Sequence, residues 1–150
     1  MSVSQRLIEL GIDLPPVAAP VAAYVPAVRA GTYVHTSGQL PVVDGVLTVT
    51  GTVGATASAA EATAGARIAA LNALAAAASA AGGIDRIARI VKVTVFVAST
   101  PDFTGQPAVA NGASEILTEI FGTPHARSAV GCAALPLGVP VEVELIAEID

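Results

Sequence analysis

One long helix, expected to begin after Ser58 and to end at Gly82-Gly83, constrains the fold more than any other feature. Ser58 and Glu61 match a capping box, in which the serine hydroxyl accepts a hydrogen bond from a free amide of the first turn and the glutamate reaches back to another. The stretch to about Ala81 is rich in alanine, which has the highest helix propensity. Apolar side chains recur at the spacing of a helix face that packs on a sheet: Ile68, Leu71, Leu74 and Ala75.

Short strands are expected before and after this helix. They lie at residues 24–29, 33–37, 46–53, 89–98, 127–133 and 141–149. The turn at Ala30-Gly31 predicts that the first two form a hairpin. The run 89–98 is apolar at nearly every position, which is typical of a central, buried strand. In 141–149 several residues depart from strict alternation, so we expect a strand there but leave the direction of its side chains open.

A second helix is expected from about Pro107 to Phe121, and a short amphipathic helix at residues 3–10 that ends at Gly11. The proline-rich stretch IDLPPVAAP must run extended. It is too apolar for a free linker, so we expect an ordered arm across the surface. Residues 1–16 are therefore interpreted as an N-terminal helix and arm of one domain that spans residues 1–150.

This order of elements predicts an α+β fold, with about six strands in one mixed sheet and both long helices on one face. The other face of the sheet would be bare in a monomer. Hydrophobic residues make up 53% of the chain and charged residues 13%, which leaves little polar material for the surface. We therefore expect an oligomer to cover part of the apolar surface.

Composition argues against several classes of protein. The net charge is -5 and Lys92 is the one lysine, so no basic patch is available to bind phosphates, and we do not expect nucleic acid as a partner. Cys132 is the one cysteine, and the N-terminus lacks the pattern of a signal peptide, so we expect a cytoplasmic protein that does not enter a membrane. His35 and His125 lack zinc-site spacing, and nucleotide-binding glycine motifs are missing. We expect no metal and no cofactor.

Arg127 and Glu142 are the candidates for chemistry. Arg127 stands where a strand begins, and its guanidinium can bind a carboxylate through two parallel hydrogen bonds. Antiparallel pairing of the last two strands would put Glu142 within a few residues of the Arg127 strand. The residues alone favour equally a functional site and a structural ion pair at the sheet edge.

Five segments together resemble the RidA/YjgF superfamily, and the resemblance covers residues 17–149. They read AAYVPAV, HTSGQLP, KVTVFVASTPDF, VANGASEILTEIFG and HARSAVGCAALPLGVPVEVELIAEI. The resemblance implies a chorismate-mutase-like α+β fold and a homotrimer with three clefts between subunits. It also implies hydrolysis of 2-imino or enamino acids to 2-oxo acids and ammonia.

The resemblance also assigns residues to this cleft. Arg127 matches the arginine that binds the substrate carboxylate, and Glu142 matches the glutamate that orients or activates water. The remaining positions are Tyr24 near the cleft mouth, Ser37 and Gly38 of the SG motif, Asn111 on the second long helix, and Ala129, whose backbone helps to hold water. Three of these positions also have a structural alternative: interface packing for Tyr24, a backbone turn for Gly38 and a helix-to-loop tie for Asn111.

One departure from the family bears on function. Many active deaminases carry a cysteine two residues after the arginine, where this chain has Ala129. Because the thiol is not the nucleophile of the family's reaction, the change does not exclude this activity. Two other functions remain open beside the deaminase. One is a protein that binds a small carboxylate without turnover, and the other is an endoribonuclease, against which the acidic balance argues.

Overall fold

The computed structural model describes residues 1–20 and 22–150. Its helices are α1 (Val3–Glu9), α2 (Ala59–Ala81) and α3 (Gln106–Phe121), with the short 3-10 turns η1 (Ile84–Arg86) and η2 (Pro136–Gly138). Its strands are β1 (Ala27–Ala30), β2 (Tyr33–Thr36), β3 (Val42–Val43), β4 (Val46–Leu47), β5 (Ile87–Ala98), β6 (Ala126–Cys132) and β7 (Val141–Ile149). The α+β class is as predicted.

The main sheet has five strands in the order β1-β2-β7-β5-β6, so the expectation of about six in one sheet was too high. Only β5 and β6 run parallel, and the other pairs are antiparallel. The segment 46–53 contributes no strand to this sheet. Its β4 pairs with β3 in a separate two-stranded hairpin, because the chain turns back at Gly45 and again at Gly51, both of which have positive φ.

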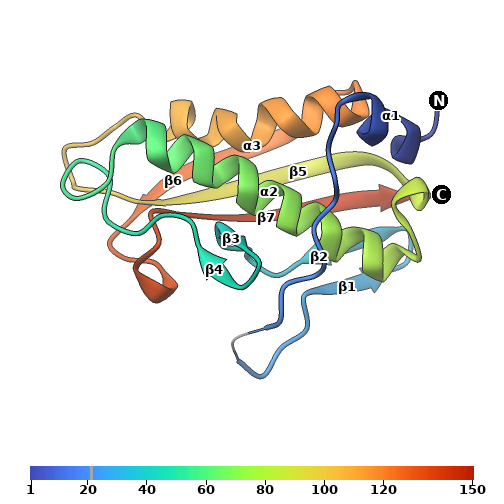
Figure 1. The fold of residues 1–150 in the computed structure, drawn as a ribbon, viewed down its shortest axis with the longest axis horizontal. Helices are drawn as coiled ribbons and strands as arrows, with labels where there is room; N and C mark the ends of the chain where they lie inside the picture. Colours follow the sequence, from blue (N-terminus) through green and yellow to red (C-terminus); the bar gives the residue numbers. More distant parts are fainter. Residues whose placement is uncertain (21) are drawn as a thin grey trace.

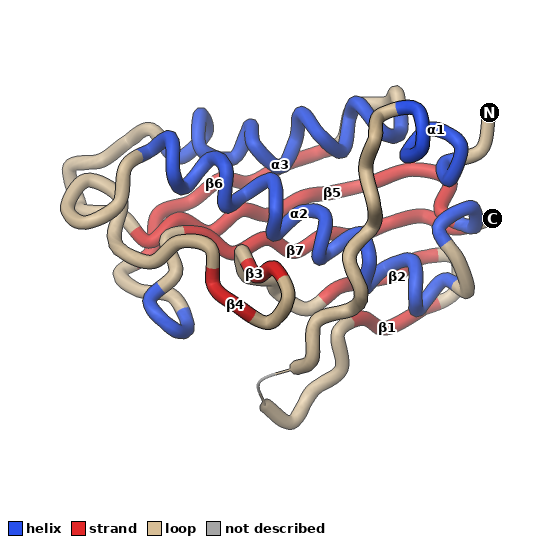
Figure 2. The backbone as a smooth tube through the Cα atoms, viewed as in Figure 1, coloured by secondary structure: helices blue, strands red, loops and turns tan. Residues whose placement is uncertain are grey.

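The long helices lie side by side on one face of the sheet (Figures 1 and 2). Helix α2 begins and ends as predicted: Ser58 Oγ accepts from the Glu61 amide at 3.0 Å, and Gly82 caps the helix with φ 87°. Although α2 is long and apolar enough to cross a bilayer, 67% of its most apolar 18-residue stretch is buried inside the protein. It is therefore a core helix.

Strand β7 alternates perfectly between buried and half-buried residues. The buried set faces the helices: Val141, Val143, Leu145, Ala147 and Ile149. The direction that the sequence left open is decided by Ile146, which joins Glu142 and Glu144 on the opposite face. An apolar residue therefore lies on the face without helices, and this is why the pattern in the sequence looked irregular.

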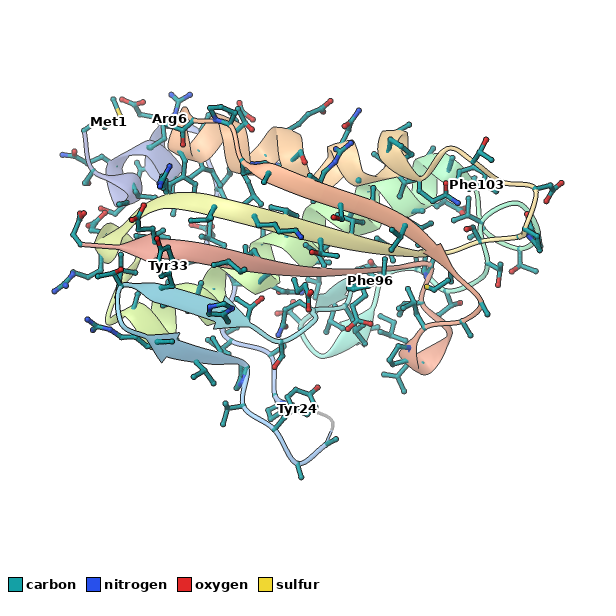
Figure 3. The ribbon with its side chains drawn as sticks, turned by 180° about the vertical axis from the view of Figure 1, so that it is seen from behind. Met1, Arg6, Tyr24, Tyr33, Phe96 and Phe103 are labelled. Carbon is teal, nitrogen blue, oxygen red and sulfur yellow. The ribbon has the colours of Figure 1, made fainter. Side chains whose placement is uncertain are left out.

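The face without helices keeps exposed apolar side chains. Val28 is 54% exposed, Tyr33 40% and Val130 44%. Figure 3 views this face and shows Tyr33 and Phe96 on it. The prediction of a face left bare by a single chain is confirmed.

The two long helices approach closely at Gly112. A Cβ on Gly112 would lie 2.1 Å from the carbonyl oxygen of Thr63 on α2, well inside contact distance. The carbonyl belongs to the backbone of α2, so it can move only if the helix moves. Small residues at this crossing therefore fix the distance between the helices.

We predict that Gly112→Ala destabilises the protein. Alanine improves helix propensity by about 1 kcal/mol, but overpacking against Thr63 costs about 1–3 kcal/mol. A 2.1 Å approach to a backbone atom lies at the upper end of that cost, so the variant should lose on the order of 2 kcal/mol in urea unfolding at a fixed protein concentration. A variant as stable as the parent would mean that the helices separate without cost.

Candidate functional site

Arg127 lies on β6, the edge strand of the sheet, in register with Val93 of β5. Its side chain reaches toward α3. There Nη1 donates to Asn111 Oδ1 at 2.7 Å and to Ser114 Oγ at 3.2 Å. Asn111 and Ser114 stand three residues apart on α3 and so share one face of the helix.

These two bonds occupy one nitrogen of the guanidinium. Within the described chain, Nη2 and Nε of Arg127 have no hydrogen-bond partner, which leaves three N–H groups free. The Nε and Nη2 edge has the fork geometry that fits both oxygens of a carboxylate. Asn111 and Ser114 thus fix the guanidinium from one side and leave its other side available.

His125 extends this cluster, and sequence reasoning missed both it and Ser114. His125 Nε2 lies 2.9 Å from Ser114 Oγ, while the buried Nδ1 has no partner among the described residues. Burial lowers the pKa of His125, and the positive charge of Arg127 lowers it further. The imidazole therefore favours its neutral form. The position of His125 two residues before Arg127, on the same side of an edge strand, was the signal available in the sequence.

Glu142 belongs to a second cluster on the open face of β7. A Cβ on Gly38 would lie 1.8 Å from Glu142 Oε1, so the carboxylate occupies space that only glycine leaves. Burial raises the pKa of Glu142, and the negative charge of Glu144 raises it further. The Cys132 thiol is near enough that the Glu142 charge adds to burial in raising its pKa.

The turn before β1 joins this cluster through Ser37. Ser37 Oγ donates to the carbonyl oxygen of Val25 at 2.6 Å, so the hydroxyl ties the turn to the end of β2. Strand β1 begins only at Ala27, three residues later than predicted, because Pro26 has no amide for a ladder. Tyr24 therefore lies in the turn, 42% exposed, and projects from it in Figure 3.

The two clusters lie apart in one chain, which corrects the expected pairing of the last two strands. Strand β5 separates β6 from β7, and Arg127 shares a row with Leu145 rather than with Glu142. Two strand spacings and three residues give a Cα separation of about 14 Å. The side chains also point to opposite faces, and no ion pair joins them within the described residues.

The predicted site residues thus form two groups. Arg127, Asn111 and Ala129 lie at the β6 edge, beside α3. The others lie on the far side of β5, around β2 and β7: Tyr24, Ser37, Gly38 and Glu142. A single chain cannot use both groups on one small molecule.

Comparison with known proteins gives consistent matches over nearly the whole chain. The model of the family described as endoribonuclease L-PSP matches residues 16–149. Protein TCP17 of Trypanosoma cruzi is 45% identical over 151 residues, which cover 99% of this chain and 94% of that protein.

Solved structures are also similar over nearly the whole chain. Protein Atu1372 of Agrobacterium tumefaciens is 42% identical with a TM-score of 0.89, covering 99% of this chain and 92% of that one. TdcF of Escherichia coli, solved with bound serine, is 29% identical with a TM-score of 0.64. The match covers 91% of this chain and 94% of TdcF.

We predict that Glu142→Gln stabilises the protein at neutral pH. The raised pKa means that the folded state holds this proton more tightly than the unfolded state, so stability falls as the pH rises from the ordinary glutamate pKa of about 4.3 through the raised value. Glutamine removes that cost. The melting temperature of the variant should exceed that of the parent at pH 7.5, and the difference should shrink toward pH 3.5.

Glu115→Gln is the matched control, because Glu115 is exposed on α3. It should show no comparable gain at pH 7.5. A Glu142→Gln variant that is less stable than the parent at neutral pH would contradict the prediction.

Proposed function

Because the chain belongs to the endoribonuclease L-PSP family, which is the RidA/YjgF family, we propose that it hydrolyses 2-imino or enamino acids to 2-oxo acids and ammonia. The observation that carries the proposal is the free Nε and Nη2 edge of Arg127, held in place by Asn111 and Ser114. A fixed guanidinium fork recognises a carboxylate, which both substrate and product carry. A relative in this family, TdcF, has been solved with bound serine, which also carries a carboxylate.

The proposed site lies between subunits. Within one chain, the Cα atoms of Arg127 and Glu142 are about 14 Å apart and their side chains lie on opposite faces of the sheet. The two side chains are therefore too far apart to act on one small molecule. The open face of the sheet carries exposed apolar side chains that association would bury. We propose a homotrimer in which Arg127 of one subunit meets Gly38 and Glu142 of the next.

In this cleft, Arg127 binds the carboxylate of the substrate and so fixes the position of the adjacent imine carbon. Within one chain, burial raises the pKa of Glu142 above its ordinary value. Once the substrate carboxylate neutralises Arg127, this raised pKa suits a group that takes a proton and later returns it. Tyr24 is placed to cover the mouth of the cleft, and the backbone at Ser128 and Ala129 helps to hold the water.

The reaction needs two steps. Glu142 takes a proton from water as the oxygen bonds to the carbon of the protonated imine, which gives a neutral carbinolamine. Glu142 then returns the proton to nitrogen as the carbon–nitrogen bond breaks and ammonia leaves, and the hydroxyl group releases its proton to solvent to give the 2-oxo acid. The iminium carbon is already electrophilic, so neither step requires a covalent enzyme intermediate. Such a metabolic enzyme, with one cysteine, is proposed to work in the cytoplasm.

We predict that Arg127 and Glu142 affect different steps. Arg127→Lys keeps the charge but loses the fork, and it should weaken binding of a 2-oxo acid and slow hydrolysis. Arg127→Ala should cost more, about 1.5–3 kcal/mol of binding. Glu142→Gln should cut turnover about 10²–10⁴-fold and leave carboxylate affinity nearly intact. Ammonia release from freshly generated 2-iminobutanoate measures turnover, and calorimetry with 2-oxobutanoate measures affinity.

Two single variants of exposed residues, Arg67→Ala and Glu115→Gln, serve as controls and should change neither turnover nor affinity. A protein that only binds carboxylates would show no turnover above background and would tolerate the loss of Glu142. Loss of stability in equal measure from Arg127→Ala and Glu142→Gln, with normal activity per folded protein, would make both residues architectural.

We predict that the two inactive variants restore activity when they share a trimer. In a cyclic trimer formed by chance from equal amounts of Arg127→Ala and Glu142→Gln chains, about one cleft in four joins an intact Arg127 to an intact Glu142. Coexpressed chains should therefore regain about a quarter of the parental activity, with a mass by light scattering near three times 14.8 kDa.

Separately purified variants, mixed under conditions in which subunits do not exchange, are the control and should stay inactive. No recovery in verified mixed trimers would mean that each cleft takes both residues from one chain. A stable monomer would remove the intersubunit site.

A further inference from the structure

A large cavity lies under the N-terminal arm, away from the Arg127 cluster. Its volume is about 770 Å³, within the range of sites that bind small molecules. Figures 1 and 2 show the arm crossing the outer side of α2 before it reaches the turn ahead of β1. The cavity lies between the arm, α2 and the β3–β4 hairpin. Its walls are mainly apolar: Leu14, Val17, Leu40, Leu47, Ile68 and Leu71.

Ile68 and Leu71 are less buried than expected for residues on the core face of α2. Sequence periodicity assigned both to the face that packs on the sheet, yet both are only half-buried, whereas Leu74 on the next turn is fully buried. The arm spans this part of the helix without filling the space beneath it. Apolar surface is thus held open rather than packed.

Two buried carboxamides line the same cavity. Gln39 is 7% exposed, and its side-chain amide has no hydrogen-bond partner among the described residues. Asn72 is 3% exposed; its Nδ2 donates to the carbonyl oxygens of Leu40 and Val42, at 3.0 and 2.9 Å, and its Oδ1 has no partner in the described chain. Among all described residues, His125 Nδ1 is the one solvent-inaccessible side-chain N or O atom without a partner. The free atoms of Gln39 and Asn72 therefore keep access to solvent, and both residues line the cavity.

The charges at this cavity are negative. Of its described lining residues, the charged ones are Asp13 and Asp44, and both are exposed at the rim. An anion entering the cavity would lose water and meet like charges, with no lysine or arginine to compensate it. A neutral molecule avoids this cost, and a hydroxyl or amide on it can pair with the free carboxamide atoms.

We propose that this cavity is a second binding site, for a neutral small molecule with an apolar body and one hydroxyl or amide group. Neither Arg127 nor Glu142 lines it. Tyr24 and Gly38 of the Glu142 cluster also line the cavity, so the two regions are neighbours. Glu142 packs against Gly38 on the open face, whereas Gln39 is in register with buried Val143 on the helix side. Part of the arm wall, residues 13–15, precedes the family match at 16–149.

The test uses 1-octanol as the probe and octanoate as its charged counterpart, titrated into the full-length protein at pH 7.5. We expect saturable binding of one octanol per chain and at least tenfold weaker binding of octanoate. Gln39→Leu should remove most of the preference for octanol over an alkane of the same length, since it deletes the free amide. Ala18→Trp should fill the cavity from the arm and abolish binding.

Ala23→Trp is the matched control, because Ala23 is an exposed alanine in the turn ahead of β1 that does not line the cavity, and it should bind octanol like the parent. Arg127→Ala should also keep octanol affinity, which separates this site from the proposed carboxylate cleft. The proposal is overturned if octanol does not saturate, if octanoate binds as well, or if Ala18→Trp binds normally while folded.

Discussion

Strand β5 is the element on which the other parts depend, because it joins the antiparallel strands of the main sheet to the one parallel neighbour, β6. It pairs with β7 in antiparallel fashion and with β6 in parallel. A parallel neighbour requires a crossover, and α3 supplies it, returning the chain over the same face that α2 covers. That crossover brings Asn111 and Ser114 beside the β6 edge. The hydrogen bonds to Arg127 are thus a consequence of the β5-α3-β6 connection.

The same strand keeps the two candidate clusters apart. With β5 between β6 and β7, Arg127 points to the helix side and Glu142 to the open side. An edge strand and an open face are surfaces that a second copy of the chain can reach. The separation inside one chain is therefore the physical reason to propose a cleft shared by two subunits, in which neither cluster works alone.

Helix packing sets how much space is left over. Gly112 and the alanines of α2 let the two helices and the sheet approach closely. Toward the arm this tight packing stops, and Ile68 and Leu71 face a cavity with two buried amides in its wall. The same helix is thus densely packed near Gly112 and faces the cavity near Ile68 and Leu71. The cavity therefore results from the way the arm crosses α2, and the core itself is tightly packed.

The sequence by itself determined the three helices with their ends, and most of the strands. The capping box at Ser58 and the left-handed Gly82 fix α2 through bonds between neighbours in the chain, which is why local reasoning located them correctly. It also led to the hypothesis, through the family resemblance, that Arg127 binds a carboxylate and Glu142 moves a proton. Tertiary structure alone decided which strands are neighbours, that residues 46–53 leave the main sheet, and that Ser114 and His125 surround Arg127. Strand order depends on contacts between residues distant in the chain, and side-chain periodicity carries no record of which strand lies next to which.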